Sequence, residues 1–248
     1  MNDTKFKMLE DCAAHLKNAI TIFTKVIPPP EYTEAVAGHF RHKEGDERIF
    51  VVLRCVRITS AVYSCLILLR HGFIQETGVL IRTILEFTHD IDFAVDGLVH
   101  KENAIAVKER MKAFFEDDYR AENEWMKETS KAPTTPRKKI YAASARLFGG
   151  SNPFRSRQIS KTLEDAYSGY VHGNYPHIME LYDGDHKQFQ TTGIISRVPE
   201  WLELLAHSVH PVLNVFATVA IAFGIPNLEK ALIEQRKVLE ESEVYKGT

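Results

Sequence analysis

Long apolar segments with helical spacing, each bounded by glycine or proline, dominate this sequence. Residues 47–71 and 73–99 are mostly apolar and meet at Gly72, and glycine commonly ends helices. Residues 199–224 begin with proline and end with glycine, which is typical of the two ends of a helix. Alternation of apolar and polar residues, which marks half-buried strands, is scarce. The sequence therefore predicts an all-α multi-helix bundle, with a central antiparallel hairpin over 47–99 and a buried C-terminal helix over 199–224.

Shorter helices are expected around this core. A first helix over residues 5–26 ends before three consecutive prolines, which cannot continue it. An amphipathic helix over 101–129 has one charged face and is expected on the outside of the bundle. No repeat or shift in composition marks a boundary, so we expect a single domain over 1–248, with a core at 47–180. The other expected helices cover 137–148, 156–170 and 226–242, and the segments 31–46 and 171–192 are expected to be irregular or, for the first, a short helix.

The composition excludes several classes of protein. The 248 residues are 44% hydrophobic and 26% charged, with a net charge of −2; a disordered, collagen-like or disulfide-rich chain would differ strongly. The three cysteines form no CxxC pair, and the first residues lack the apolar stretch of a signal peptide. Residues 204–225 are the most apolar, but they include two histidines, a proline and an asparagine. We therefore expect a buried core helix, no membrane contact and a cytoplasmic protein.

Polar side chains are few on the apolar helices, and they align. At 100° per residue, the polar groups of the 73–99 helix fall within about a third of a turn of each other. On the 199–224 helix the polar residues are separated by 3, 4, 3, 4 and 4 positions, which forms one narrow stripe. The stripes are Gln75, Arg82, Glu86, His89 and Asp90 on the first, Glu200, Glu203, His207, His210, Asn214 and Thr218 on the second, and Arg54, Arg57, Ser60 and Ser64 on the 47–71 helix.

The hairpin geometry predicts which of these groups meet. In an antiparallel pair joined near Gly72, Arg54 comes level with Asp90, and Arg57 comes level with Phe87. We expect the two arginines to reach Glu86 or Asp90 and to form charge-assisted hydrogen bonds there. Two explanations of the stripes remain open. The polar groups face water or form buried ion pairs that fix the bundle, or they line one polar cavity suited to chemistry or binding.

A segment rich in histidine, tyrosine and glycine lies further along the chain. Residues 168–177 read SGYVHGNYPH, with several turn-forming residues. Irregular segments often carry function, and His172 is a candidate acid or base near neutral pH. Tyr170, Asn174 and Tyr175 are candidate binding residues beside it. The alternative is that His172 has only a structural role or faces solvent.

The sequence lacks the motifs of several well-known catalytic and cofactor-binding sites. No GxGxxG, GxxxxGK[ST], HExxH or GxSxG motif occurs, so dinucleotide, P-loop, zinc-protease and α/β-hydrolase sites are not expected. A di-iron bundle needs two Glu-x-x-His pairs, and only Glu86 with His89 has that spacing. A single metal ion held by Glu203, His207 and His210 is an alternative with feasible geometry. We expect no metal and no cofactor.

Two stretches resemble known proteins. The hairpin LLRHGFIQETGVLIRTILEFTHDIDFA and the downstream YSGYVHGNY resemble an uncharacterised family of bacterial all-α proteins, over about residues 47–180. That family is similar in turn to the HEPN superfamily, which includes metal-independent ribonucleases of toxin and phage-defence systems. These enzymes carry arginine, four to six further residues and histidine on one helix, and Arg82 and His89 have six residues between them.

The resemblance implies an RNA partner, a homodimer and no cofactor. His89 would take a proton from an RNA 2′-hydroxyl, Arg82 would stabilise phosphate charge, and Glu86 and His172 would complete the site. Arg54, Arg57, His207 and His210 would bind substrate or ligand. The alternative is a non-catalytic helical binding module with structural ion pairs, and a small-molecule ligand is compatible with it. A basic surface for RNA is expected from Arg137, Lys138, Lys139, Arg146, Arg155, Arg157 and Lys161.

Overall fold

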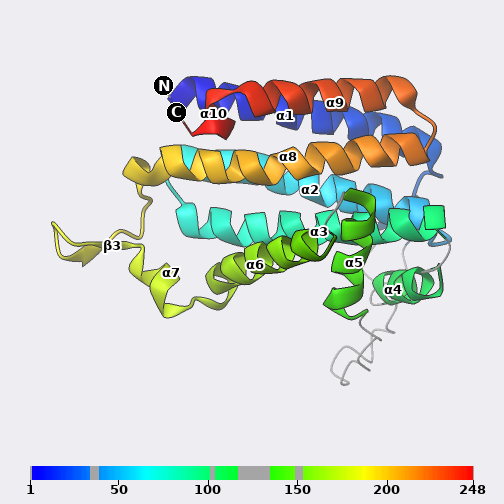
Figure 1. Cartoon of the computed structure of the whole chain (residues 1–248), viewed down its shortest axis with the longest axis horizontal. Helices are drawn as coiled ribbons and strands as arrows, with labels where there is room; N and C mark the ends of the chain where they lie inside the picture. The colour runs from blue at the N-terminus through cyan, green and yellow to red at the C-terminus, as the bar shows by residue number, and fades with distance from the viewer. Residues whose placement is uncertain (1, 34–38, 101–103, 117–134, 149–152, 248) are drawn as a thin grey trace.

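The computed structural model of the chain is an all-α bundle in which helices account for 80% of the residues (Figure 1). It describes residues 2–33, 39–100, 104–116, 135–148 and 153–247. The predicted fold class is therefore confirmed.

The helical hairpin at the centre is formed by α2 (Glu47–Arg70) and α3 (Ile74–His100). Asp46 caps the start of α2, since its carboxylate accepts a hydrogen bond from the backbone N–H of Ile49 at 2.7 Å. The turn between the helices requires glycine at position 72, where φ is +74° and an added Cβ would lie 2.6 Å from the backbone of Ile194. The backbone N–H of Ile194 also donates to the Gly72 carbonyl at 2.8 Å, which ties the hairpin to the C-terminal half.

Helix α8 (Val198–Ala222) forms the other half of the core. Its side chains Trp201 and Phe216 are fully buried, and the helix packs against α1, α2, α3 and α9. In Figure 1, α1 (Asn2–Phe23), α9 (Pro226–Glu241) and α10 (Glu243–Lys246) lie on one side of α8 and α2. The predicted buried C-terminal helix is confirmed, because a long apolar helix is stable in water only when other elements cover it.

The opposite face of α3 is covered by α5 (Arg137–Phe148) and α6 (Pro153–His172), both of which pack on it. Helix α4 (Ala104–Glu116) lies near the end of α3 and contacts both α2 and α3. The predicted helix over 101–129 is thus observed over part of its length, and residues 117–134 lie outside the described part of the chain. Helices therefore lie on two sides of α3, with α2 and α8 on one side and α5 and α6 on the other (Figure 1).

Two segments expected to be irregular contain short antiparallel strand pairs. Strand β1 (Glu31–Thr33) pairs with β2 (His39–Arg41), and β3 (Tyr182–Asp183) pairs with β4 (Gln188–Phe189). In the second pair the Tyr182 and Phe189 rings meet edge to face at 5.2 Å, and the Asp183 carboxylate accepts two backbone N–H bonds in the turn. Helix α6 extends to His172, and a short helix α7 (Tyr175–Met179) follows it. The 3-10 turns are Thr24–Val26 and Ile195–Arg197.

Two helical segments, Glu47–Arg70 and Ile195–Ala222, are long and apolar enough to cross a membrane by length and composition alone. Of the most apolar window in each, 50% and 61% of the residues are buried inside the bundle. Core helices of water-soluble proteins meet the same criterion.

Candidate functional site

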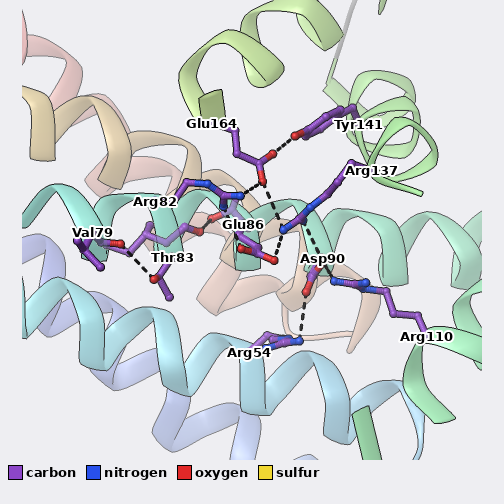
Figure 2. Close-up of polar contacts among 12 residues, drawn as sticks. Arg54, Val79, Arg82, Thr83, Glu86, Asp90, Arg110, Arg137, Tyr141 and Glu164 are labelled. Carbon is purple, nitrogen blue, oxygen red and sulfur yellow. Dashed lines mark hydrogen bonds and ion pairs between the residues drawn. The ribbon is translucent and has the colours of Figure 1, made fainter. Parts of the chain in front are cut away.

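A cluster of arginines and carboxylates lies where α2, α3, α4, α5 and α6 approach one another (Figure 2). Side chains at steps of four residues share one helix face, and this spacing places three members of the cluster on one face of α3. The cluster consists of Arg54, Arg82, Glu86, Asp90, Arg110, Arg137 and Glu164, and the Tyr141 hydroxyl hydrogen-bonds to Glu164.

Arg82 is held at one end of the cluster by two carboxylates. Its Nη1 donates to Glu86 at 2.9 Å, and its Nη2 lies 2.5 Å from an oxygen of Glu164 on α6. Arg137, at the start of α5, pairs with Glu86 and lies 3.3 Å from the same Glu164 oxygen. Burial raises the pKa of Glu164 against the opposing effect of the two guanidinium groups. Both terminal nitrogens of Arg82 are thus engaged by carboxylates of the protein itself.

Asp90 is the centre of the other end, and its side chain is fully buried. Its two oxygens lie 3.2 Å from Arg54 and 2.5 Å from Arg110, so the predicted pairing of Arg54 with Asp90 is confirmed. The Arg54 guanidinium also lies over the rings of three phenylalanines, and burial lowers its pKa. Arg57, the other arginine predicted to reach this region, is exposed. The rings around Arg54 are those of Phe87 at 4.2 Å, Phe114 at 4.8 Å and Phe50 at 5.2 Å.

His89 lies beside the cluster and takes no part in its ion pairs. The side chain is 7% exposed, and its ring meets the Tyr141 ring edge to face at 5.4 Å. Within the described part of the chain, its buried Nδ1 has no hydrogen-bond partner. Burial, and next the charges of Arg137 and Arg82, lower the pKa of His89 to about 4. The imidazole is therefore neutral at neutral pH, with one donor and one acceptor nitrogen.

A cavity of about 480 Å³ opens next to His89, between α3, α5, α6, α8 and α9. It brings together parts of the predicted stripes of the 73–99 and 199–224 helices, whereas the 47–71 helix contributes nothing to its lining. This volume lies within the range of pockets that hold small organic molecules. The polar lining residues are Thr88, His89, Asp92, Ser144, Ser160, His210, Asn214 and Arg236, and the apolar ones are Leu85, Ala145, Ile159, Leu163, Pro211 and Val215.

Asp92, one turn beyond His89, is a buried carboxylic acid in the cavity wall. It is 2% exposed, and burial raises its pKa to about 7, with a smaller contribution from the charge of Asp96. A hydrogen bond with Ser144 acts in the opposite direction. The α3–α5 side of the cavity therefore presents a neutral imidazole and a carboxyl group whose raised pKa favours the protonated form more than in an ordinary aspartate.

The polar stripe of α8 is largely paired with neighbouring helices. Glu203 binds Lys5 of α1 at 2.7 Å, and His210 binds Glu240 of α9 at 2.6 Å. His207 is exposed, and its ring stacks on Tyr245 at 4.5 Å. Among the described residues there is no group of His, Cys, Asp or Glu side chains able to hold a metal ion. The alternative of a single metal held by Glu203, His207 and His210 is therefore wrong, because the three groups bind different partners.

The segment around His172 lies apart from the cluster. His172 follows Glu164 by eight residues on α6, a rise of about 12 Å along the helix, and it is exposed together with Asn174 and Tyr175. Tyr170 is partly buried instead: its hydroxyl donates to Glu180 at 3.0 Å and its ring packs on Trp201. The structure thus brings Arg82 and Glu86 together and places His89 beside them, but it leaves His172 outside the group.

Several residues of this region were not anticipated from the sequence, or were assigned elsewhere. Arg137 and Arg146 were expected on a basic surface, but Arg137 joins the cluster and Arg146 pairs with Asp96. A carboxylate between Ile91 and Phe93 interrupts an apolar run, and this pattern could have indicated Asp92 from the sequence. Glu164, Arg110 and Arg236 carried no such signal, because each is one of many charged residues on an amphipathic helix.

Comparisons with family models, with curated proteins and with solved structures each find no match for this chain.

Proposed function

We propose that this protein is a non-catalytic helical binding module, which holds a small molecule in the cavity between α3, α5, α6, α8 and α9. The observation that carries the proposal is the mixed lining of this 480 Å³ cavity, in which polar side chains from α3, α5, α6, α8 and α9 stand beside an apolar wall. Pockets that hold small molecules are lined mainly by apolar side chains, with a few polar groups that orient the ligand.

The arginine–carboxylate cluster is given a structural role in this proposal. Each of its three carboxylates contacts at least two guanidinium groups from different helices, which joins α2, α4, α5 and α6 to α3. Buried ion pairs of this kind are sensitive to the loss of one partner. They hold together α3, α5 and α6, which also line the cavity.

The binding test uses N-phenyl-1-naphthylamine, a neutral apolar dye that fluoresces when it leaves water. We expect saturable binding by the wild-type protein with one site per chain. Ser160→Phe places a ring in the cavity and is expected to weaken binding at least about tenfold, as the loss of a well-filled pocket does. Lys161→Phe is the matched control, because Lys161 is the exposed neighbour of Ser160 on α6. Absence of saturable binding, or equal binding by both variants, would refute the proposal.

A HEPN-like, metal-independent ribonuclease acting as a homodimer on RNA is the second candidate. The observation in its favour is that Arg82 and His89 lie two turns apart on the same side of α3. The engagement of both Arg82 terminal nitrogens by carboxylates counts against it. RNA would meet exposed basic side chains such as Lys138 and Lys139. For either candidate we propose the cytoplasm, since the three cysteines are free and buried.

Cleavage of RNA by the purified protein distinguishes the two candidates. The ribonuclease requires activity in the wild type that falls at least about a hundredfold in His89→Ala, a usual loss for a general base. His172→Ala tests the exposed histidine in the same assay. No cleavage by the wild type, or equal cleavage by all three proteins, removes the ribonuclease and leaves the binding module.

A further inference from the structure

The α8–α9 side of the cavity differs in charge from the α3–α5 side, and the difference indicates what the cavity binds. Arg236 of α9 lines it with Asn214 and His210 of α8. The Arg236 Nη1 donates to the Asn214 side-chain oxygen at 3.0 Å, which orients the guanidinium. The Arg236 side chain is 27% exposed, so part of it remains accessible. A guanidinium held in this way offers directed donors on a fixed support.

Among the described residues, the carboxylate that pairs with Arg236 is that of Glu240, and this pairing is loose. An oxygen of Glu240 lies 4.0 Å from the Arg236 Nε, and the same oxygen is bound at 2.6 Å by His210. Glu240 is also 39% exposed, so that water screens part of its charge. The positive charge of Arg236 is therefore available to a group in the cavity.

The apolar lining residues indicate the chemistry of the part of the ligand that does not contact Arg236. Leu85, Ile159, Leu163, Pro211 and Val215 form an apolar wall that suits a hydrocarbon or aromatic body. Two of these side chains, Ile159 and Leu163 of α6, are 51% and 44% exposed, so a ligand in contact with them would cover apolar surface that now faces water. On the α3–α5 side, the neutral His89 imidazole and the Asp92 carboxyl, whose pKa is raised by burial, are able to exchange hydrogen bonds with a neutral polar group.

We infer that the cavity binds a small organic anion, with its apolar body against α6 and α8 and its anionic group at the Arg236 guanidinium beside Asn214. Carboxylate, sulfonate and phosphate groups share the planar or tripodal oxygens that a guanidinium recognises by paired hydrogen bonds. This inference rests on the proposed binding function, because it concerns the same cavity.

Two dyes with the same aromatic body test the inference. 1-Anilinonaphthalene-8-sulfonate is N-phenyl-1-naphthylamine with an added sulfonate, so the comparison isolates the negative charge. We expect the wild type to bind the sulfonate about tenfold more tightly than the neutral dye, the usual value of a charge-assisted hydrogen bond in a partly buried site. Arg236→Gln is expected to remove this preference, so that the variant binds the two dyes with affinities that differ by less than about twofold.

Two further variants and a folding check complete the design. Arg236→Lys keeps the charge and is expected to retain part of the preference, whereas Lys237→Gln removes an exposed charge from the neighbouring position of α9 and is expected to retain all of it. Far-UV circular dichroism and a cooperative urea transition show that each variant is folded, since these dyes also bind loosely packed states.

The possible results distinguish failure of the binding function from failure of the inference that the ligand is an organic anion. Failure of both dyes to bind the wild type overturns the binding function itself. Binding of the neutral dye as tightly as the sulfonate, or an equal loss of both dyes in Arg236→Gln, overturns the organic anion and leaves a cavity for neutral ligands. Loss of the preference in Lys237→Gln as well as in Arg236→Gln also overturns it, because the charge effect would then be general to the surface.

Discussion

Asp92→Asn is expected to change how the stability of the fold depends on pH. Asp92 is a carboxylic acid held at the α3–α5 contact with 2% exposure, and its pKa is raised from 3.8 to about 7, chiefly by burial. Asparagine has nearly the same shape and is neutral at every pH. The substitution therefore removes the ionisation of this site while leaving its packing close to that of the wild type.

The sign and size of the effect follow from linkage. A carboxyl group whose pKa is higher in the folded state contributes stability that is complete below the unfolded pKa, near 3.8, and is lost as the pH rises to about 7. A difference of about three pKa units at about 1.4 kcal/mol each amounts to about 4 kcal/mol. The free-energy difference between Asp92→Asn and the wild type should thus shift by about 4 kcal/mol in favour of the variant between about pH 4 and pH 8.

In the wild type, the titration of His89 masks the pH dependence of stability that Asp92 causes. Its folded pKa of about 4 lies below the ordinary value of 6.5, so its contribution is present above pH 6.5 and is lost as the pH falls toward 4. The two groups therefore act in opposite directions over the same pH range and largely cancel in the wild type. In Asp92→Asn only the histidine effect remains, and we expect the variant to lose about 3 kcal/mol on acidification from about pH 7 to pH 4.

Urea unfolding followed by far-UV circular dichroism at several pH values measures both quantities. Asp165→Asn, which removes an exposed carboxylate on α6, is the control and should follow the wild-type curve within about 0.5 kcal/mol. A difference between Asp92→Asn and the wild type that is the same at about pH 4.5 and about pH 7.5 would refute the reasoning, because an acid of ordinary pKa gives no shift over that range.

Two further substitutions test the cluster and the packing of α3. Glu164→Gln leaves Arg82 and Arg137 with one carboxylate fewer in a site that is 3% exposed, and urea unfolding should show a loss of about 3–5 kcal/mol, as for the breaking of other buried ion pairs; a loss below about 1 kcal/mol would show that the cluster is not structural. Gly78→Ala adds a Cβ that would lie 2.6 Å from the Tyr170 ring, so we expect a loss of about 1–3 kcal/mol from overpacking, and an unchanged unfolding midpoint would contradict this contact between α3 and α6.

The sequence identified the main helices because their signals are local. Proline and glycine at the ends of the apolar segments placed the boundaries of α2, α3, α5, α8 and α9 within a few residues of those observed. Its errors were in short elements. The strand pairs β1–β2 and β3–β4 have only two or three residues per strand, too few for a periodic pattern, and they form because aromatic rings such as Tyr182 and Phe189 meet across the turn.

The candidate site was predicted in part, and the division has a physical cause. Periodicity within one helix placed Arg82, Glu86 and Asp90 on a common face, and the tight turn at Gly72 set the level at which Arg54 meets Asp90. These contacts depend on separations along the chain that are short or fixed by one turn. His172 was grouped with them because of its turn-rich segment and the family resemblance, and the length of α6 holds it about 12 Å from Glu164 along the helix axis.

The all-α class, the central hairpin and the alignment of polar groups on its helices follow from the order of residues alone, because helix geometry converts spacing along the chain directly into direction in space. The partners of those groups depend instead on how the helices pack. Glu164 and Arg137 contact Arg82 and Glu86 from positions more than fifty residues further along the chain, and the cavity forms where Arg236 and Asn214 of the C-terminal helices meet the helix of His89. These contacts depend on how five helices pack together, and the residue pattern of a single helix does not determine that packing.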